Sequence, residues 1–138
     1  MALVGGGGAG NTAGGNPSGT GSSLNYIGNH VYGYSGTVTY NNNFTTCLDH
    51  TTGNEYIQCR VYWSFSEAGN DNVEMQIFMN DELIFANEAL NLVASEPYAT
   101  TYVDILIPSF TRIKIGALNA TDTTTHPVNV TLTGRTYA

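Results

Sequence analysis

Hydrophobic and polar residues alternate with a period of two along most of the chain after residue 23. The clearest run is Tyr56–Phe65, in which every odd-numbered position is apolar and includes Trp63. Such an alternation places every second side chain on the same face of a β-strand. We therefore expect a strand whose apolar side chains, Trp63 among them, face the core, while Tyr56 and Tyr62 face outward.

The same alternation of apolar and polar residues recurs in short segments separated by turn-forming residues. Asn80 and Asp81 tolerate positive φ, so a tight hairpin is expected there. Residues 87–97 have little pattern and end at Pro97, which predicts a loop with at most one helical turn. Seven to nine strands and no long helix predict an all-β fold, a single antiparallel jelly roll or β-sandwich of about eight strands. The expected strands are 31–40, 44–48, 56–65, 73–79, 82–86, 101–107, 112–117 and 128–137.

Residues 1–23 differ from the rest, since nine of them are glycine and the only sizeable apolar side chains are Leu3 and Val4. Fixing a backbone costs roughly 1–2 kcal/mol per residue, and two aliphatic side chains return only about 1.5–3 kcal/mol each. We expect an arm (1–23) that orders only against a partner, followed by a sandwich domain (24–138). The candidate partner-binding residues are Leu3, Val4, Gly5, Gly6, Asn11 and Asn16 of the arm, with Tyr56 and Tyr62 of the sandwich.

Charge narrows the range of partners. The chain of 138 residues has a net charge of −7, and only 11% of its residues are charged, less than half the usual share. It lacks the basic stripe that nucleic acid or an anionic membrane requires. Its start has no basic region of a secretory signal, and no segment is apolar enough to span a membrane, so synthesis in a cytoplasm is expected. The composition fits an ordinary β-domain with polar loops or a virion-surface protein.

Candidate chemistry is sparse. Cys47 and Cys59 could oppose each other in a hairpin around Gly53 and form a disulfide, but a reducing cytoplasm favours two buried thiols. The three histidines are far apart in sequence and adjoin loops, so no metal site is expected. They are His30, His50 and His126.

Two acidic features remain open at this point. The loop 69–72 offers oxygen ligands for calcium, although turns favour the same residues. Asp104 interrupts the apolar run 102–107 and either faces solvent or binds a partner backbone or an arginine such as Arg112. No local pattern of a catalytic triad is present, so we expect no enzyme, no metal and no cofactor.

The layout resembles that of small decoration (cement) proteins of tailed-phage capsids: the arm MALVGGGGAGNTAGGNPSGTG, then a jelly roll ending near VTLTGRTYA. The hairpin VEMQIFMNDELIFANEA and that ending are also similar to a wider group of trimeric jelly rolls. The resemblance implies copies, as homotrimers, that bind the outside of a preformed capsid, bridge neighbouring major capsid subunits and spread the arm over the shell. It carries no site over residue by residue.

Two other functions stay open. A carbohydrate- or receptor-binding sandwich, such as a fibre or tail-associated head, would use an exposed Trp63 or exposed tyrosines as sugar platforms. A hydrolase or metal-dependent enzyme on a jelly roll would need a cluster of histidines that the sequence does not suggest.

Overall fold

The computed structural model describes residues 22–65, 71–89 and 99–138, and all regular elements in these ranges are β-strands. The all-β prediction is confirmed, and most expected segments lie within an observed strand. The strands are β2 (Asn25–Ile27), β3 (His30–Tyr40), β4 (Thr45–Thr51), β5 (Tyr56–Phe65), β6 (Val73–Met79), β7 (Glu82–Ala89), β8 (Ala99–Ile107), β9 (Arg112–Asn119) and β10 (His126–Tyr137).

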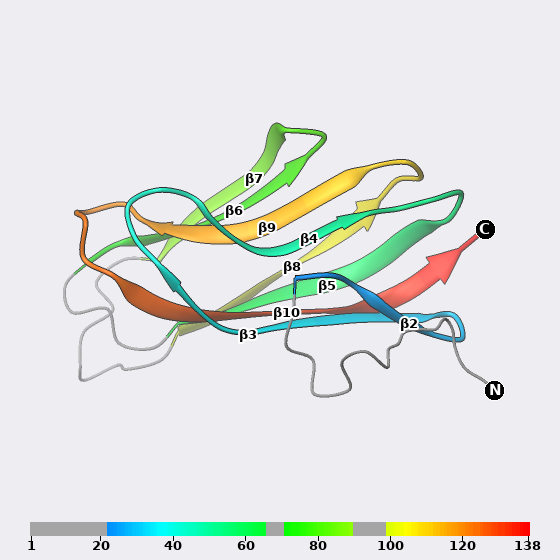
Figure 1. The fold of residues 1–138 in the computed structure, drawn as a ribbon, viewed down its shortest axis with the longest axis horizontal. Helices are drawn as coiled ribbons and strands as arrows, with labels where there is room; N and C mark the ends of the chain where they lie inside the picture. Colours follow the sequence, from blue (N-terminus) through cyan, green and yellow to red (C-terminus); the bar gives the residue numbers. More distant parts are fainter. Residues whose placement is uncertain (1–21, 66–70, 90–98) are drawn as a thin grey trace.

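The strands form two antiparallel sheets that stack as a sandwich (Figure 1). One sheet has the order β2-β3-β10-β5-β8 and the other the order β4-β9-β6-β7. The pairing is nested, because β3 pairs with β10, β4 with β9, β5 with β8 and β6 with β7. This is the arrangement of one long hairpin rolled into two sheets, which defines a jelly roll. The short strand β2 is added at the edge beside β3.

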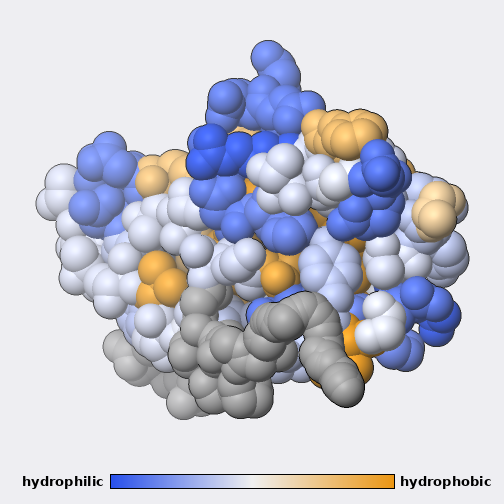
Figure 2. All heavy atoms as spheres, turned by 45° about the vertical axis from the view of Figure 1, so that its right-hand side comes forward, coloured by the Kyte–Doolittle hydropathy of each residue, from blue (hydrophilic) through white to orange (hydrophobic). Residues whose placement is uncertain are grey.

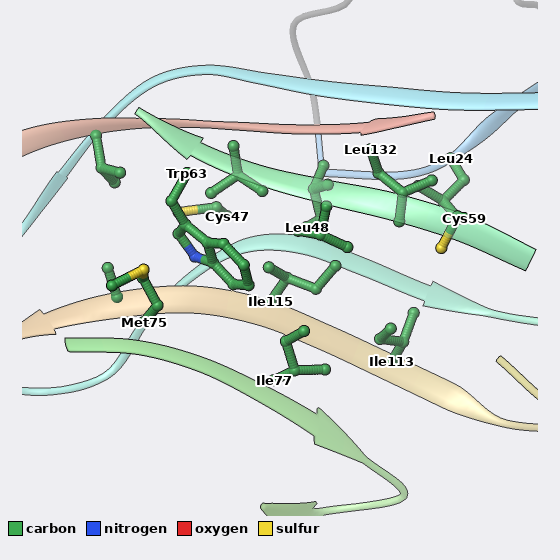
Figure 3. Packing of buried hydrophobic residues seen from close by; sticks show 14 of the residues in the cluster. Leu24, Cys47, Leu48, Cys59, Trp63, Met75, Ile77, Ile113, Ile115 and Leu132 are labelled. Carbon is green, nitrogen blue, oxygen red and sulfur yellow. The ribbon is translucent and has the colours of Figure 1, made fainter. Parts of the chain in front are cut away.

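The core lies between the sheets and takes side chains from both. In β5 the odd-numbered residues are buried, as the alternation predicts, and Trp63 is 0% exposed. Figure 3 shows its indole reaching from β5 toward Ile115 and Met75 of the opposite sheet. The indole N–H donates to the Gly116 carbonyl at 3.0 Å. Trp63 therefore joins the two sheets by packing and by a hydrogen bond.

The hairpin between β6 and β7 forms where the sequence predicts it. Asn80 and Asp81 have φ angles of 50° and 68°, the left-handed conformation that a tight hairpin turn requires. The turn is also held from outside, since Asn80 Oδ1 accepts from the Arg112 backbone N–H and the Asn80 N–H donates to the Arg112 carbonyl. These bonds attach the β6–β7 hairpin to the start of β9.

The hairpin considered around Gly53 does not form. β4 pairs with β9 and β5 pairs with β10 and β8, so the two segments belong to different sheets. Cys47 and Cys59 are buried and unbonded, and Figure 3 shows them well apart. The prediction of buried thiols is confirmed. The disulfide fails because residues near in sequence pair here with distant strands.

The prediction of a loop over residues 87–97 is wrong at the start of that range. β7 continues to Ala89, which pairs with Val73, so pairing with β6 overrides the weak local pattern. Residues 90–98 lie outside the described ranges.

A register shift between β6 and β7 at Ile77/Phe78 places Phe85 inward and leaves Leu83 exposed. The Phe85 ring stacks on Trp63, with a distance of 5.8 Å between the ring centroids.

Candidate functional site

The outer face of the five-stranded sheet is the surface on which chemistry-bearing side chains gather. It consists of the residues that alternate with the buried set on each strand. Tyr56 and Tyr62 lie on it, as the alternation predicts. Its other main members are His30, Tyr32 and Tyr34 of β3, Gln58 and Arg60 of β5, Tyr102, Asp104 and Leu106 of β8, and Thr131, Thr133, Arg135 and Tyr137 of β10.

Of the eight tyrosines in the described ranges, six lie on this face, arranged as three contacting pairs. The ring centroids of the pairs are 5.2–5.5 Å apart, within the range of favourable aromatic contacts. Two pairs are tilted and the third is stacked with an interplanar angle of 17°. A tyrosine offers both a ring face and a hydroxyl, so such a surface suits recognition. The pairs are Tyr32–Tyr34, Tyr62–Tyr102 and Tyr56–Tyr137.

The strand register places these groups in rows that run across the sheet. One row is Tyr34–Thr131–Tyr62–Tyr102, and the next is Tyr32–Thr133–Arg60–Asp104. Neighbours across strands lie about 4.5–5.5 Å apart at Cβ, close enough for their side chains to touch. Each row takes its members from four strands that are distant in sequence, so no local sequence motif predicts the row.

Arg60 and Asp104 form an ion pair on this face, between β5 and the edge strand β8. The Arg60 Nε and Nη2 groups donate to the two Asp104 carboxylate oxygens at 2.6 and 3.0 Å. The guanidinium carbon also lies 4.2 Å from the centre of the Tyr102 ring. The hydrogen bond from Arg60 holds the pKa of Asp104 below its usual value. A bidentate pair fixes both side chains and neutralises both charges.

Asp104 is thus solvent-facing and paired, but not with Arg112 as the sequence analysis considered. Arg112 binds Asp49 instead, through donor distances of 3.0 and 2.8 Å. Arg60 lies directly opposite Asp104 in the β5–β8 ladder, whereas Arg112 starts a strand of the other sheet. The partner of Asp104 is therefore determined by which strands pair and not by closeness in sequence.

Two shallow hollows open on the outer face and meet at Thr133 and Gly134. The larger, of about 460 Å³, is lined by Ile27, His30, Val31, Tyr32, Tyr34, Thr133 and Gly134. The smaller, of about 310 Å³, is lined by Gln58, Cys59, Arg60, Asp104, Thr133 and Gly134. These volumes fall at the lower end of the range for ligand sites. The lining mixes aromatic rings with hydroxyl, amide, imidazole and charged groups.

Comparison of the sequence with known proteins finds no match, so the function must be argued from the geometry. No protein-family model matches the chain, and no curated protein matches it in sequence. Within the described residues, no helix is long and apolar enough to cross a membrane. Figure 2 shows that polar and intermediate residues dominate one side of the molecule and that hydrophobic residues form separate patches there.

A second polar cluster joins β2 to the β4–β5 connection. The Tyr26 hydroxyl donates to Glu55 Oε2 and lies 2.9 Å from His50 Nε2. Because the hydroxyl hydrogen goes to Glu55, His50 is the donor in the second bond. Burial lowers the pKa of His50 and raises that of Tyr26. Glu55 also accepts from the Gly53 N–H, so the cluster is an internally bonded clamp with a structural role.

A third cluster lies where β9 and β10 meet the segment before β6. Asp71 accepts from the Asn119 amide at 2.9 Å and lies 2.8 Å from His126 Nε2. The bond to His126 lowers the pKa of Asp71. The side-chain Oδ1 of Asn119 accepts from the Thr121 N–H, and the side-chain Nδ2 of Asn119 also donates to the Thr124 carbonyl. These bonds fix the β9–β10 connection.

The candidate calcium loop 69–72 is described only at Asp71 and Asn72. The Asp71 carboxylate is bound to Asn119 and His126, as the cluster above shows. No group of three His, Cys, Asp or Glu residues suited to a metal occurs in the ranges that the structure describes.

The two cysteines are poor nucleophiles. Burial raises the pKa of Cys47 and of Cys59 to about 12, and nucleophilic attack requires the thiolate. Both therefore act as small core residues.

The sequence-predicted site residues divide into two groups. Leu3, Val4, Gly5, Gly6, Asn11 and Asn16 lie outside the described residues. Tyr56 and Tyr62 lie on the outer face, each paired with a tyrosine from another strand. The sequence analysis missed Tyr32, Tyr34 and Arg60 as surface-site residues. The alternation of β5 could have indicated that Arg60 lies on the outer face. The two tyrosines of β3 lie near Arg60 only because β10 pairs with both β3 and β5.

Proposed function

We propose that this protein is a structural, non-enzymatic component of a virion that binds the outside of a tailed-phage capsid and cements neighbouring major capsid subunits. Residues 1–21 make the main contact with the shell, and the jelly roll remains on the outer surface. The proposal combines the resemblance in layout with one structural observation, the way in which the chain is anchored where the described part begins.

That anchor lies on one side of the sandwich, at the edge strands of both sheets. The Ser22 carbonyl accepts from the Asp49 N–H of β4 at 2.7 Å. Leu24 is buried, and its side chain packs over Gly33 of β3, where an added Cβ would lie 2.6 Å from it. The preceding 21 residues are thus attached at a fixed place. Fully extended, they reach at most about 75 Å.

The composition of those residues supports a contact made along a surface. Glycine lets a backbone approach another surface closely, and the amide groups of the arm then supply hydrogen bonds. Leu3 and Val4 provide two aliphatic anchors, and Asn11 and Asn16 add side-chain donors and acceptors. Many copies on one lattice would increase the total strength of attachment by avidity.

We also propose contacts between copies of the chain, as a homotrimer. Tyr56 and Tyr137 stack beside the C-terminal end of β10 and offer an aromatic corner for such a contact. Tyrosine is enriched in the energetically important parts of protein interfaces.

The copy number of the protein in purified virions tests this function. Quantitative mass spectrometry should find it in an amount comparable to the major capsid protein. A few copies per particle would point to a fibre or tail protein instead, and absence from the particle would refute a virion role.

A further inference from the structure

We propose that the two hollows on the outer face form one binding site for an uncharged oligosaccharide. The inference does not depend on the proposed attachment to a capsid, because that attachment uses residues 1–21. It rests on the described residues alone.

The shape of the site is the first argument. The two hollows share Thr133 and Gly134 of β10, so they adjoin each other, and a ligand that occupies both would lie in a shallow groove across the strands from β2 and β3 to β8. Five strands at about 4.8 Å spacing make a sheet roughly 19 Å wide between its edge strands. A groove that crosses this width fits a short chain of linked rings better than a single small molecule.

The chemistry of the lining is the second argument. Sugar rings present apolar C–H faces between hydroxyl groups, so their binding needs aromatic faces together with polar groups that both donate and accept. Tyr32 and Tyr34 supply rings and hydroxyls on one side of Thr133. Gln58 supplies an amide on the other side, next to Arg60 and Asp104.

Charge favours a neutral ligand over an anionic one. The charge of Arg60 is matched by Asp104 in the same hollow, at 2.6 and 3.0 Å. The chain as a whole has a net charge of −7, which opposes an anion. The paired side chains still offer N–H donors and carboxylate lone pairs to hydroxyl groups.

The site is also held in place before a ligand arrives. The bidentate bond to Asp104 and the contact with the Tyr102 ring fix the Arg60 guanidinium, and Tyr32 and Tyr34 support each other at 5.3 Å. Side chains that are already ordered lose less entropy on binding. Trp63, considered in the sequence analysis as a sugar platform, is buried, so the platform is formed by tyrosines.

The test is a titration of the full-length, ¹⁵N-labelled protein with cellohexaose, maltohexaose and chitohexaose, and with hexagalacturonic acid as the charged comparison. Saturable shifts of the amide signals of Gln58 and Thr133 with at least one neutral hexasaccharide are expected. Tyr32→Ala should weaken that binding about tenfold, since loss of an aromatic contact is worth up to about 1.5 kcal/mol. Arg60→Gln should weaken it as well.

Phe110→Ala is the matched control, because it removes an exposed aromatic ring that lies in the β8–β9 connection, outside both hollows. It should leave the affinity within about twofold, since its ring makes no part of the site. Thermal unfolding of each variant verifies that the fold is retained, and Tyr32→Phe serves as a milder change if Tyr32→Ala does not fold. Binding of none of the neutral hexasaccharides, stronger binding of hexagalacturonic acid, or binding that both Tyr32→Ala and Arg60→Gln leave unchanged would each overturn the proposal.

Discussion

Replacing Trp63 by alanine should cost about 3–5 kcal/mol of unfolding free energy, the usual range for loss of a large aromatic core side chain. Trp63 is fully buried, stacks on Phe85 and donates its indole N–H to the Gly116 carbonyl of the opposite sheet. The substitution would leave a cavity and would also leave that carbonyl without this donor. Domains of this size are stable by only about 5–15 kcal/mol, so a large share of the total stability would be lost.

Urea unfolding followed by far-ultraviolet circular dichroism measures this loss, because the signal does not depend on the tryptophan. Phe110→Ala is the control: its ring is 70% exposed, and its removal should change the free energy by no more than about 0.5 kcal/mol. Equal stability of the Trp63→Ala and Phe110→Ala proteins would contradict the central position of Trp63 in the core.

Gly116→Ala should destabilise the protein by about 1–3 kcal/mol or more, although it adds a single carbon. A Cβ at this position would lie 2.0 Å from the Thr45 carbonyl oxygen and 2.8 Å from the Phe44 ring. The Thr45 oxygen belongs to the backbone of β4, so relief of the clash requires the β4–β9 ladder to move. The same movement would disturb the acceptor of the Trp63 indole, which is Gly116 itself.

Gly53→Ala is the matched control for this substitution. Its added Cβ would approach only Glu55 Oε1, at 3.0 Å, and that atom is at the far end of a flexible side chain. Thermal unfolding should therefore show a clear fall in the midpoint for Gly116→Ala and a much smaller change for Gly53→Ala. A similar midpoint for both variants would mean that the close approach of β4 and β9 at Gly116 is not as the structure describes it.

Alternation along the chain was sufficient to predict the fold class and the burial of Trp63. It could do so because each strand repeats the same local rule, apolar inward and polar outward. Local turn chemistry likewise predicted the hairpin at Asn80 and Asp81. These features depend only on residues close together in the sequence, so they can be predicted from a single sequence.

The pairing of distant strands could not be predicted in the same way. Arg60 and Asp104 are 44 positions apart, and their contact depends on β5 and β8 being neighbours in one sheet. The Tyr32 and Arg60 positions are linked through β10, which pairs with both β3 and β5. Since alternation does not specify which strands are neighbours, Arg112 was considered for Asp104, and Cys47 was considered beside Cys59. The site on the outer face follows from topology, and of its residues the sequence analysis named only Tyr56 and Tyr62 as partner-binding.

The most direct test of the proposed function is a titration of the purified protein onto tailed-phage capsid shells that lack it, with bound protein measured after sedimentation. We expect saturation at a fixed ratio to the major capsid protein. A Leu3→Ser, Val4→Ser double variant should bind at least about tenfold more weakly, since two buried aliphatic side chains contribute roughly 1.5–3 kcal/mol each. Absence of binding to the shells, or binding that never saturates, would contradict the assignment of this jelly roll to the capsid surface.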